Sequence, residues 1–546
     1  MGVVGSRLVA PRDEDDDDPY FDDVSDQDDE GGEPSEEEAD RDLVRLRDEL
    51  RGPIVVDDEA DSGLGAALDE DELDLWGPRA VDEDAEAAPL GDDAHSGLLA
   101  RYLEVERELA ARWPETKIEP SLDRVIAVVD VLGDPQKAFP VIHVAGTNGK
   151  TSTARMIEAL LRSFGLRTGL TTSPHLHSVR ERIRLDGEVV DMERFVAVYD
   201  DIAPYVEAVD RRTVELGGPR LSYFELLTVM AFATFADAPV DVAVIETGMG
   251  GTWDATNVAD GMVAVITPVD LDHQEYLGPD IATIAGEKAG IIKADAAVIL
   301  AHQGLEAAEV LLARSVVVGA TVAREGVEFG IVSRAPAIGG QVLSLQGPGS
   351  RYDDIFLPLF GEHQASNAAV ALAAVEAFLG GGAQSLDPEL VRAGFASVTS
   401  PGRLEVVRRG PTVVVDAAHN PHGARALAAA IVDGFEFTHL VGVVAVLGDK
   451  DARGVLAALE PILAEVIVTR SSSPRAVDPD ELAALAVEVF GHERVRTTAR
   501  LSEALDLAVE RADEAAVELG GGAGVLVTGS VVTAAEARAL LGRVEA

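Results

Sequence analysis

The sequence has no cysteine among its 546 residues, and aromatic side chains make up only 5% of it. Without cysteine, disulfide bonds and thiolate metal sites are excluded, so any bound metal must have oxygen or nitrogen ligands. Long hydrophobic runs are missing as well. The longest, near Leu440 to Leu447, suits a buried strand and is far too short to span a membrane. The apolar stretch before the acidic run at Asp13 is too short for a secretory signal. We therefore expect a soluble, cytoplasmic protein that does not bind membranes.

Basic residues are scarce, with 45 Lys and Arg against 97 Asp and Glu, for a formal net charge of −52. Residues 1–97 alone contain 35 acidic residues and 7 basic ones. Such a segment cannot bury enough apolar surface to offset its chain entropy, so we predict a disordered acidic extension. It is either a solubilising tail or a docking segment for a basic partner that the sequence does not identify. The overall charge also disfavours nucleic acid as a partner, because phosphate backbones would be repelled.

The remaining chain alternates between strand and helix patterns. After a helix that starts near His95 and stops at Pro114, apolar strands end at Ala145, Glu246 and Thr267, with helices between them. This pattern predicts a mainly parallel sheet covered on both faces. Residues 316–359 are rich in glycine and predict short antiparallel strands. A second alternation begins at Pro401. We therefore predict an α/β protein with one domain at 98–400 and a second, Rossmann-like domain at 401–546.

A glycine-rich turn lies where the first of these strands meets a helix. It reads Gly146-Thr-Asn-Gly-Lys150, followed by Thr151 and Ser152. Glycines there let backbone N–H groups surround a phosphate, while the lysine reaches the outer phosphates of a nucleotide. The turn is shorter than the common P-loop, since Val144 stands where that motif has its first glycine. Either hydroxyl could face the nucleotide.

Acidic and histidine side chains follow the neighbouring strands. Glu246 closes one strand, and Asp272 and His273 follow another. Parallel sheets bind ligands at this edge, so a carboxylate here is placed to hold Mg²⁺ opposite the phosphate loop. In the second domain, Asp416 and His419 follow a strand and could bind a ribose or an amine, or simply form a polar turn.

Ten motifs in order resemble one family. The sequence is similar to folylpolyglutamate synthase/dihydrofolate synthase, a branch of the Mur ligase superfamily, over residues 98–546. The motifs are Gly146-Thr-Asn-Gly-Lys150, Thr172-Ser-Pro-His-Leu176, Tyr223-Phe-Glu225, Glu246-Thr-Gly-Met-Gly-Gly251, Asp254-Ala-Thr-Asn257, Asp272-His-Gln-Glu-Tyr-Leu-Gly278, Glu287-Lys-Ala-Gly-Ile-Ile-Lys293, His363-Gln-x-x-Asn-Ala368, Pro401-Gly-Arg403 and Asp416-Ala-Ala-His-Asn-Pro421.

The resemblance implies a P-loop ATPase domain and a C-terminal glutamate-ligase domain, with ATP and two Mg²⁺ sites between them. It also allows K⁺ or another monovalent cation. It implies that a substrate carboxylate becomes an acyl phosphate, which the amine of L-glutamate then attacks. The implied site residues fall into four groups: Thr147, Asn148, Gly149, Lys150, Asn367, Arg403 and Asp416 for ATP; Ser173, Glu246 and His273 for the metal; Ile118, Glu119, Pro120, Ser222, Tyr223, Phe224, Glu225, Trp253, Asp254 and Ala255 for dihydropteroate or a folate; and Lys150, His419 and a carbamylated Lys288 for catalysis.

Three positions depart from the family pattern. Thr151 replaces a usual glycine, Gly251-Thr-Trp-Asp254 replaces Gly-Gly-Arg-Leu-Asp, and Gly448-Asp-Lys-Asp451 begins with glycine instead of histidine. A Mur-type ligase for a nucleotide-linked muropeptide is one alternative, but it would need a folded N-terminal domain that residues 1–97 cannot form. An inactive scaffold with an acidic docking tail is another. We expect a monomeric enzyme that acts on small molecules.

Overall fold

The computed structural model describes residues 92–114 and 119–543, with side chains from His95 onward. The predicted acidic extension therefore lies almost entirely outside the described residues, and so does Ile118 of the predicted pterin pocket. Within the described ranges, no helix is long and apolar enough to cross a membrane.

An eight-stranded sheet forms the first α/β domain. The strands from β2 to β8 in sheet order pair in parallel. At one edge, β3 pairs antiparallel with β2, and β4 pairs antiparallel with β3. Its central strands are buried on both faces, as their continuous Val and Ile content predicts. In sheet order the strands are β4 (Glu188–Val189), β3 (Ile183–Leu185), β2 (Thr168–Thr171), β5 (Val242–Glu246), β1 (Val141–Ala145), β6 (Gly261–Ile266), β7 (Ala297–Leu300) and β8 (Thr321–Arg324).

The register aligns the carboxyl ends of the three central strands. β1 lies between β5 and β6, with Val144 opposite Glu246 and Ala145 opposite Ile266. The phosphate loop after β1, the carboxylate that ends β5 and the loop after β6 therefore meet at one edge of the sheet. This is the edge at which the sequence predicted the site.

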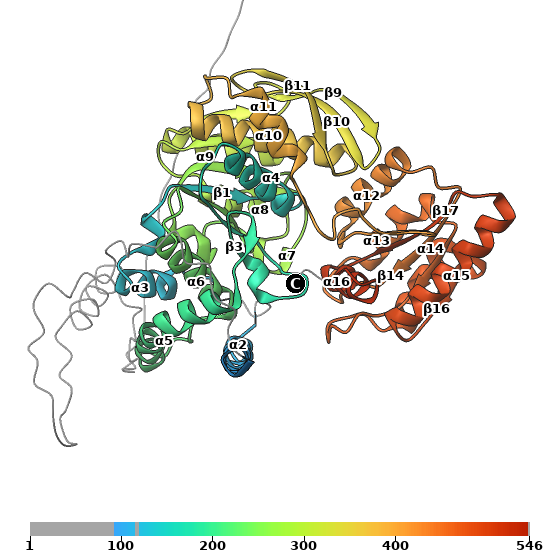
Figure 1. Cartoon of the computed structure of the whole chain (residues 1–546), viewed down its shortest axis with the longest axis horizontal. Helices are drawn as coiled ribbons and strands as arrows, with labels where there is room; N and C mark the ends of the chain where they lie inside the picture. The colour runs from blue at the N-terminus through green and yellow to red at the C-terminus, as the bar shows by residue number, and fades with distance from the viewer. Residues whose placement is uncertain (1–91, 115–118, 544–546) are drawn as a thin grey trace, which may run out of the picture. The chain divides into compact units, whose positions relative to one another are not determined.

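Alternate residues of the strands face different helices. Val263 and Val265 of β6 pack with α4 and α10, whereas Ala264 and Ile266 pack with α8 and α9. Figure 1 shows α4 and α10 next to each other, with α10 under β9 to β11. The helices of this domain are α2 (Asp92–Ala110), α3 (Asp123–Val131), α4 (Lys150–Ser163), α5 (Met192–Glu215), α6 (Tyr223–Asp237), α7 (Gln274–Leu277), α8 (Ile281–Lys288), α9 (Leu305–Val318), α10 (Glu362–Gly380) and α11 (Pro388–Ala396), with short 3₁₀ turns η2 (Pro135–Lys137), η3 (Val179–Arg182), η4 (Ala255–Val258) and η5 (Ala289–Ile291).

The predicted antiparallel segment is only partly right. A three-stranded antiparallel sheet does form, from β9 (Gly330–Ala337), β10 (Gly340–Gln346) and β11 (Arg351–Leu357). The start of the segment does not form antiparallel strands. Val316 and Val317 lie in the last turn of helix α9, where they are 81% and 78% exposed. The next strand, β8, joins the large sheet in parallel. β-branched residues usually favour strands, but here the helix is set by packing of its other face.

The C-terminal α/β unit is a six-stranded sheet whose strands are parallel except for edge strand β12. Its two faces are covered by α12 to α14 and by α15 with α16. The strands in sheet order are β12 (Glu405–Arg409), β13 (Thr412–Val415), β17 (Ala523–Thr528), β14 (His439–Val444), β15 (Glu465–Val468) and β16 (Val495–Thr497). The helices are α12 (Pro421–Gly434), α13 (Ala452–Leu459), α14 (Pro479–Phe490), α15 (Leu501–Leu519) and α16 (Val531–Leu540), with η6 (Glu460–Ile462) and η7 (His492–Arg494).

Candidate active site

The loop after β1 has a backbone that requires glycine. Gly146 has φ +145°, and a Cβ added there would lie 1.9 Å from the Thr267 hydroxyl oxygen. Gly149 has φ +87°, and its added Cβ would lie 2.6 Å from the Asn367 side-chain oxygen. Thr147 also ties the loop to the chain after β6, because its hydroxyl donates to the Asp270 carbonyl at 3.0 Å. Both glycines are therefore needed for the close approach of neighbouring chain segments.

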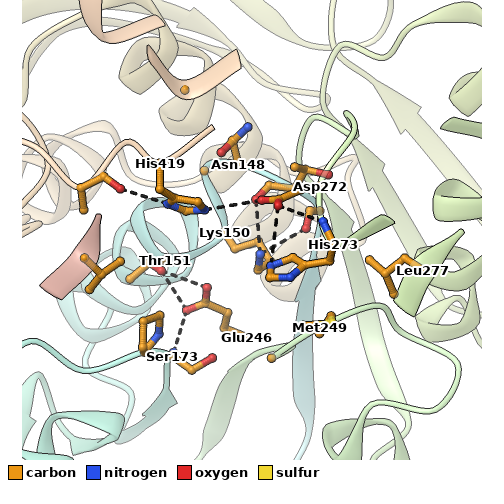
Figure 2. Close-up of a pocket in the computed structure, with 18 of the residues that line it drawn as sticks. Asn148, Lys150, Thr151, Ser173, Glu246, Met249, Asp272, His273, Leu277 and His419 are labelled. Atoms are coloured by element: carbon orange, nitrogen blue, oxygen red, sulfur yellow. Dashed lines mark hydrogen bonds and ion pairs between the residues drawn. The ribbon is translucent and has the colours of Figure 1, made fainter. Parts of the chain in front are cut away.

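Lys150 is the first residue of α4, and its ammonium group lies over the loop. It donates to the carbonyl oxygens of Gly146 at 3.2 Å and Thr147 at 3.4 Å. Next to it, the Thr151 hydroxyl donates to both carboxylate oxygens of Glu246, at 2.9 and 3.0 Å (Figure 2). The Ser152 hydroxyl instead lies 3.1 Å from that of Ser400, in a buried position. Of the two hydroxyls that the sequence left open, Thr151 is the one that faces the buried carboxylate.

Two of the three residues predicted to bind the metal, Glu246 and Ser173, are in direct contact, and the third, His273, lies at the start of α7. Glu246 is 3% exposed and also accepts a hydrogen bond from the Ser173 backbone at 3.2 Å (Figure 2). Burial raises the pKa of Glu246, because the charged form loses hydration. Burial lowers the pKa of His273 to about 4, which keeps its imidazole in the neutral form that a metal requires.

These residues fit Mg²⁺ only together with a nucleotide. No three Asp, Glu or His side chains converge on a metal position within the described ranges. Mg²⁺ is usually held by one or two carboxylates, water and substrate phosphates, so a complete protein cage is not expected. A buried carboxylate whose pKa is raised by burial is stabilised when a cation sits against it. The donors of Glu246, Ser173 and His273 therefore fit an Mg²⁺ ion that is also bound by nucleotide phosphates.

Asp272 connects the loop after β6 to the C-terminal domain. Its carboxylate accepts hydrogen bonds from Lys450 at 2.6 Å and from the Asn420 amide at 3.1 Å, and the His419 Nε2 lies 3.5 Å away. Burial acts to raise the pKa of Asp272, but the hydrogen bond from His419 and the positive charge of Lys450 hold it well below its usual range. The His419 Nδ1–H donates to the Ala417 carbonyl at 3.0 Å, which fixes the ring.

Other residues predicted to bind ATP lie on both sides of the loop. The Asn148 side-chain nitrogen lies 2.8 Å from His422 Nδ1, and the Asn148 side-chain oxygen accepts a hydrogen bond from the Asn420 amide at 3.2 Å. The two oxygens of Asp416 accept backbone N–H groups of Leu404 and Ala418, each at 2.8 Å. These two bonds fix the Asp416 side chain directly after the end of strand β13, and its remaining lone pairs are available to a ligand.

A cavity of about 720 Å³ joins these groups. Its lining includes every described residue of the predicted site except Pro120 and Tyr223, so it brings together the phosphate loop, the predicted metal ligands, Lys288, His419 and the predicted pterin residues. Tyr223 instead lies under the Arg182 guanidinium, whose carbon is 5.3 Å from the ring centroid.

The predicted pterin residues divide into two kinds. Phe224 presents a ring to the cavity, and a Cβ on Gly248 would lie 2.5 Å from that ring. The carboxylates of Glu225 and Asp254 are already used by the protein. Glu225 caps α6 and pairs with Arg124 at 2.8 Å, and Asp254 accepts from Met249 and Thr256. Both carboxylates therefore hold the pocket wall in place through bonds within the protein.

Lys288 is 4% exposed and donates to the Gly146 carbonyl at 2.8 Å. Burial and, after it, the positive charge of nearby Lys150 lower the pKa of Lys288 to about 7. Close packing holds this part of α8 against the loop after β5, since a Cβ on Gly251 would lie 2.5 Å from the Glu287 carbonyl. The amine is therefore partly neutral near pH 7 and lies directly beside the phosphate loop.

Glu181 supports the turn next to the site, and the motifs did not identify it. Its carboxylate accepts the backbone N–H groups of Leu176, His177 and Ser178 at 2.8, 2.8 and 2.9 Å. Burial acts to raise the pKa of Glu181, but these three donors lower it. Glu181 thus holds the turn that follows Ser173. The Ser178-x-x-Glu181 spacing is a capping-box pattern, so the sequence did contain a signal for it.

Replacing Glu181 by Gln should loosen that turn. We expect a loss of about 1–3 kcal/mol in the free energy of unfolding, because one oxygen that accepts backbone N–H groups becomes an amide donor. ADP release should also need more Mg²⁺ for half-maximal rate, because the Ser173 segment is displaced. Urea denaturation and a Mg²⁺ titration measure the two effects. Glu188→Gln on the exposed edge strand is the matched control, and equal behaviour of both variants would contradict the prediction.

The fold and this site define the class of protein. Residues 210–375 match the Mur ligase middle domain, and residues 402–531 match the Mur ligase glutamate ligase domain. A phosphate loop, a buried acid at the neighbouring strand end and a second α/β domain facing them are the features of an ATP-dependent ligase of the Mur type.

Comparison with individual proteins narrows the class. The chain is 56% identical over 461 residues to the dihydrofolate synthase/folylpolyglutamate synthase of Mycobacterium tuberculosis, covering 82% of this chain and 95% of that protein. It is 32% identical to the Escherichia coli enzyme of the same name, over 67% of this chain and 81% of that one. The structure of the M. tuberculosis folylpolyglutamate synthase complexed with ADP has a TM-score of 0.79 at 54% identity, covering 82% of this chain and 100% of that one.

The chain belongs to the dihydrofolate synthase/folylpolyglutamate synthase family. It is an ATP-dependent glutamate ligase, as its motifs predicted. The E. coli relative was solved in complex with DHPP and ADP, with a TM-score of 0.68 at 30% identity over 81% of this chain and 97% of that one. The muropeptide-ligase alternative is set aside by these relatives.

Proposed function

We propose that this enzyme joins L-glutamate to both dihydropteroate and tetrahydrofolates through an acyl phosphate. The observation that carries the proposal is that the phosphate loop, Glu246 and the aromatic ring of Phe224 all line the same cavity. A carboxylate attached to a ring bound near Phe224 can therefore reach the outer phosphate of ATP held at the loop.

The residues of the phosphate loop prepare ATP for attack. Backbone N–H groups and Lys150 hold the phosphates, and the lysine neutralises charge that develops as the substrate carboxylate oxygen attacks the γ-phosphorus and ADP leaves. Glu246, Ser173 and His273 would hold Mg²⁺, which supplies further neutralisation of phosphate charge when bound. A monovalent cation such as K⁺ stays a proposal with no assigned ligands.

The second step forms the amide. The glutamate amine attacks the acyl carbon, the bond to the phosphate oxygen breaks, and inorganic phosphate leaves, while the amine proton passes to solvent or a nearby base. We assign binding of the incoming glutamate to the C-terminal side of the cavity, where His419 lies beside Asp272. No covalent bond to the protein is required.

Lys288 is proposed to act as a carbamate. A neutral amine is needed to add CO₂, and the pKa of Lys288, lowered to about 7 by burial, makes that form available. A carbamate keeps one N–H for the Gly146 carbonyl and adds two oxygens beside the phosphate loop. The predicted cytoplasmic location, the monomeric state and the role of residues 1–97 stay predictions.

The substrate range is tested by mass spectrometry of products. Purified enzyme with ATP, Mg²⁺ and glutamate is given dihydropteroate or tetrahydrofolate in parallel reactions. We expect a monoglutamyl product from the first and a product lengthened by glutamate from the second. Product from only one of them would narrow the proposal to that activity, and ADP without any product, or no ADP at all, would contradict it and favour the inactive scaffold.

A further inference from the structure

One end of the cavity is lined by residues that the two reaction steps do not use. They lie before and at the start of α3, and they include Trp113, Glu119, Ser121 and Arg124. Hydrogen bonds join this segment to the start of α6. The Tyr223 N–H donates to the Trp113 carbonyl at 3.1 Å, and the Trp113 indole N–H donates to the Arg220 carbonyl at 2.7 Å. This wall of the cavity is therefore built into the fold.

Arg124 is held in a fixed orientation within this wall. Its side chain is 7% exposed, and its Nε and Nη2 donate to the same Glu225 oxygen at 3.1 and 2.8 Å. Nη2 also donates to the Glu119 carbonyl at 3.0 Å. The other Glu225 oxygen accepts the Ser222 N–H at 2.6 Å. A guanidinium paired in this two-pronged way is fixed in both position and plane.

One nitrogen of Arg124 is left over. Its Nη1 donates to no residue of the described ranges, although the side chain lines the cavity. The guanidinium carbon lies 5.7 Å from the Trp113 ring centroid, a cation–π distance. Because Nη1 reaches the cavity and has no acceptor among the described residues, it can donate to a ligand oxygen there.

We propose that Arg124 is a specificity-determining residue that reads the ring carbonyl of the pterin. Its Nη1 donates to that carbonyl, and the ring lies beside the Trp113 indole at this end of the cavity. The ring carbonyl needs only one donor, which Nη1 supplies, because Nε and Nη2 already donate to Glu225 and Glu119. Glu225 also lines the cavity, but its oxygens already accept hydrogen bonds from Arg124 and from the Ser222 N–H, so its role here is to orient Arg124. The inference rests on the proposed pterin substrate and adds how that substrate is recognised.

Steady-state kinetics tests the role of Arg124. Removal of Arg124 alone would leave Glu225 buried and unpaired, so the pair is replaced together in Arg124→Met/Glu225→Gln, and Arg124→Lys is made as the conservative variant. We expect the KM for dihydropteroate to rise about 10- to 100-fold in the double variant, the range for one hydrogen bond to a charged donor. The KM values for ATP and glutamate should not change, because the phosphate loop is untouched. Arg194→Lys, an exposed arginine on α5, is the control.

Tryptophan fluorescence gives a direct reading of binding. The chain has three tryptophans, at 76, 113 and 253. In Trp253→Phe, with a non-hydrolysable ATP analogue and Mg²⁺ present, dihydropteroate should change the emission in a saturable way. The change should disappear in Trp113→Phe/Trp253→Phe. Adding Arg124→Lys to Trp253→Phe should shift half-saturation to higher ligand concentration.

The outcomes separate this inference from the proposed function. If the wild-type enzyme makes no glutamyl product from any pterin substrate, the proposed function fails. If product forms but the KM for dihydropteroate is unchanged in the folded double variant, or if the Trp113 signal does not respond, the assignment of Arg124 and Trp113 is overturned while the function stands. Circular dichroism and thermal melting establish that each variant is folded before it is scored.

Discussion

Lys150→Ala is expected to lower ADP release by about 10³-fold or more, and Glu246→Ala is expected to do the same. Lys150 is the only lysine of the phosphate loop, and its ammonium already lies over the loop carbonyls at 3.2 and 3.4 Å. Glu246 ends β5 beside that loop and orients Thr151. ADP release is measured with dihydropteroate, glutamate, ATP and Mg²⁺ all present.

Stability distinguishes a lost function from a lost fold in this experiment. The pKa of Glu246 is raised by burial, so its ionised form opposes folding at neutral pH in the absence of a cation. Glu246→Gln removes that charge and keeps the shape, and it should melt at the same temperature as the wild type or higher while remaining inactive. Lys137→Ala, at an exposed surface lysine, is the control for Lys150. Substantial turnover in Lys150→Ala or Glu246→Ala would refute the phosphate and metal assignments.

The parts of the site that follow from local sequence were predictable. An apolar strand followed by Gly146-Thr-Asn-Gly-Lys150 indicates both a turn and a helix start, and the strand that ends in Glu246 places its acid at the same sheet edge. The same reasoning gave the α/β class and the ends of β1, β5 and β6 to within one residue. Each of these features depends on residues close together in the chain, which is why one sequence was enough.

The parts that depend on distant packing were not predictable. Nothing in the spacing of Asp272 shows that its carboxylate meets Lys450, which is far away in the sequence. The different contacts of Thr151 and Ser152, with Glu246 and with Ser400, likewise come from residues far away in the sequence. Arg124 belongs to none of the ten motifs, and only the fold brings it to Glu225.

Replacing Lys288 is expected to have the second of the two largest effects on activity. Lys288→Ala should lower kcat by about 10²-fold or more, since it removes the group nearest the Gly146 carbonyl of the phosphate loop and, with it, the proposed carbamate. A short carboxylate such as formate or acetate should restore part of the rate, because it can enter the space left by the side chain and replace the lost negative charge. The rate is measured as ADP release at saturating ATP.

The carbamate also makes the wild-type enzyme depend on CO₂ and pH. Below its pKa of about 7, Lys288 is protonated and cannot add CO₂, so the carbamate and the activity should decline as the pH falls through that value and recover above it. Depleting bicarbonate should lower wild-type activity, and restoring it should return the rate. Carbon-13 NMR with labelled bicarbonate should show a carbamate carbon in the wild type and none in Lys288→Ala.

Lys293 supplies the matched control for this last experiment. Burial lowers its pKa as well, but its amine donates to the Asn257 carbonyl at 3.2 Å, and it does not line the cavity. If a low pKa alone were enough, Lys293 would carry a carbamate as well, so Lys293→Ala would weaken the carbamate signal and the response to bicarbonate. We expect it to keep both. A wild-type rate that ignores bicarbonate, together with full activity in Lys288→Ala, would show that this lysine serves only to pack α8 against the phosphate loop.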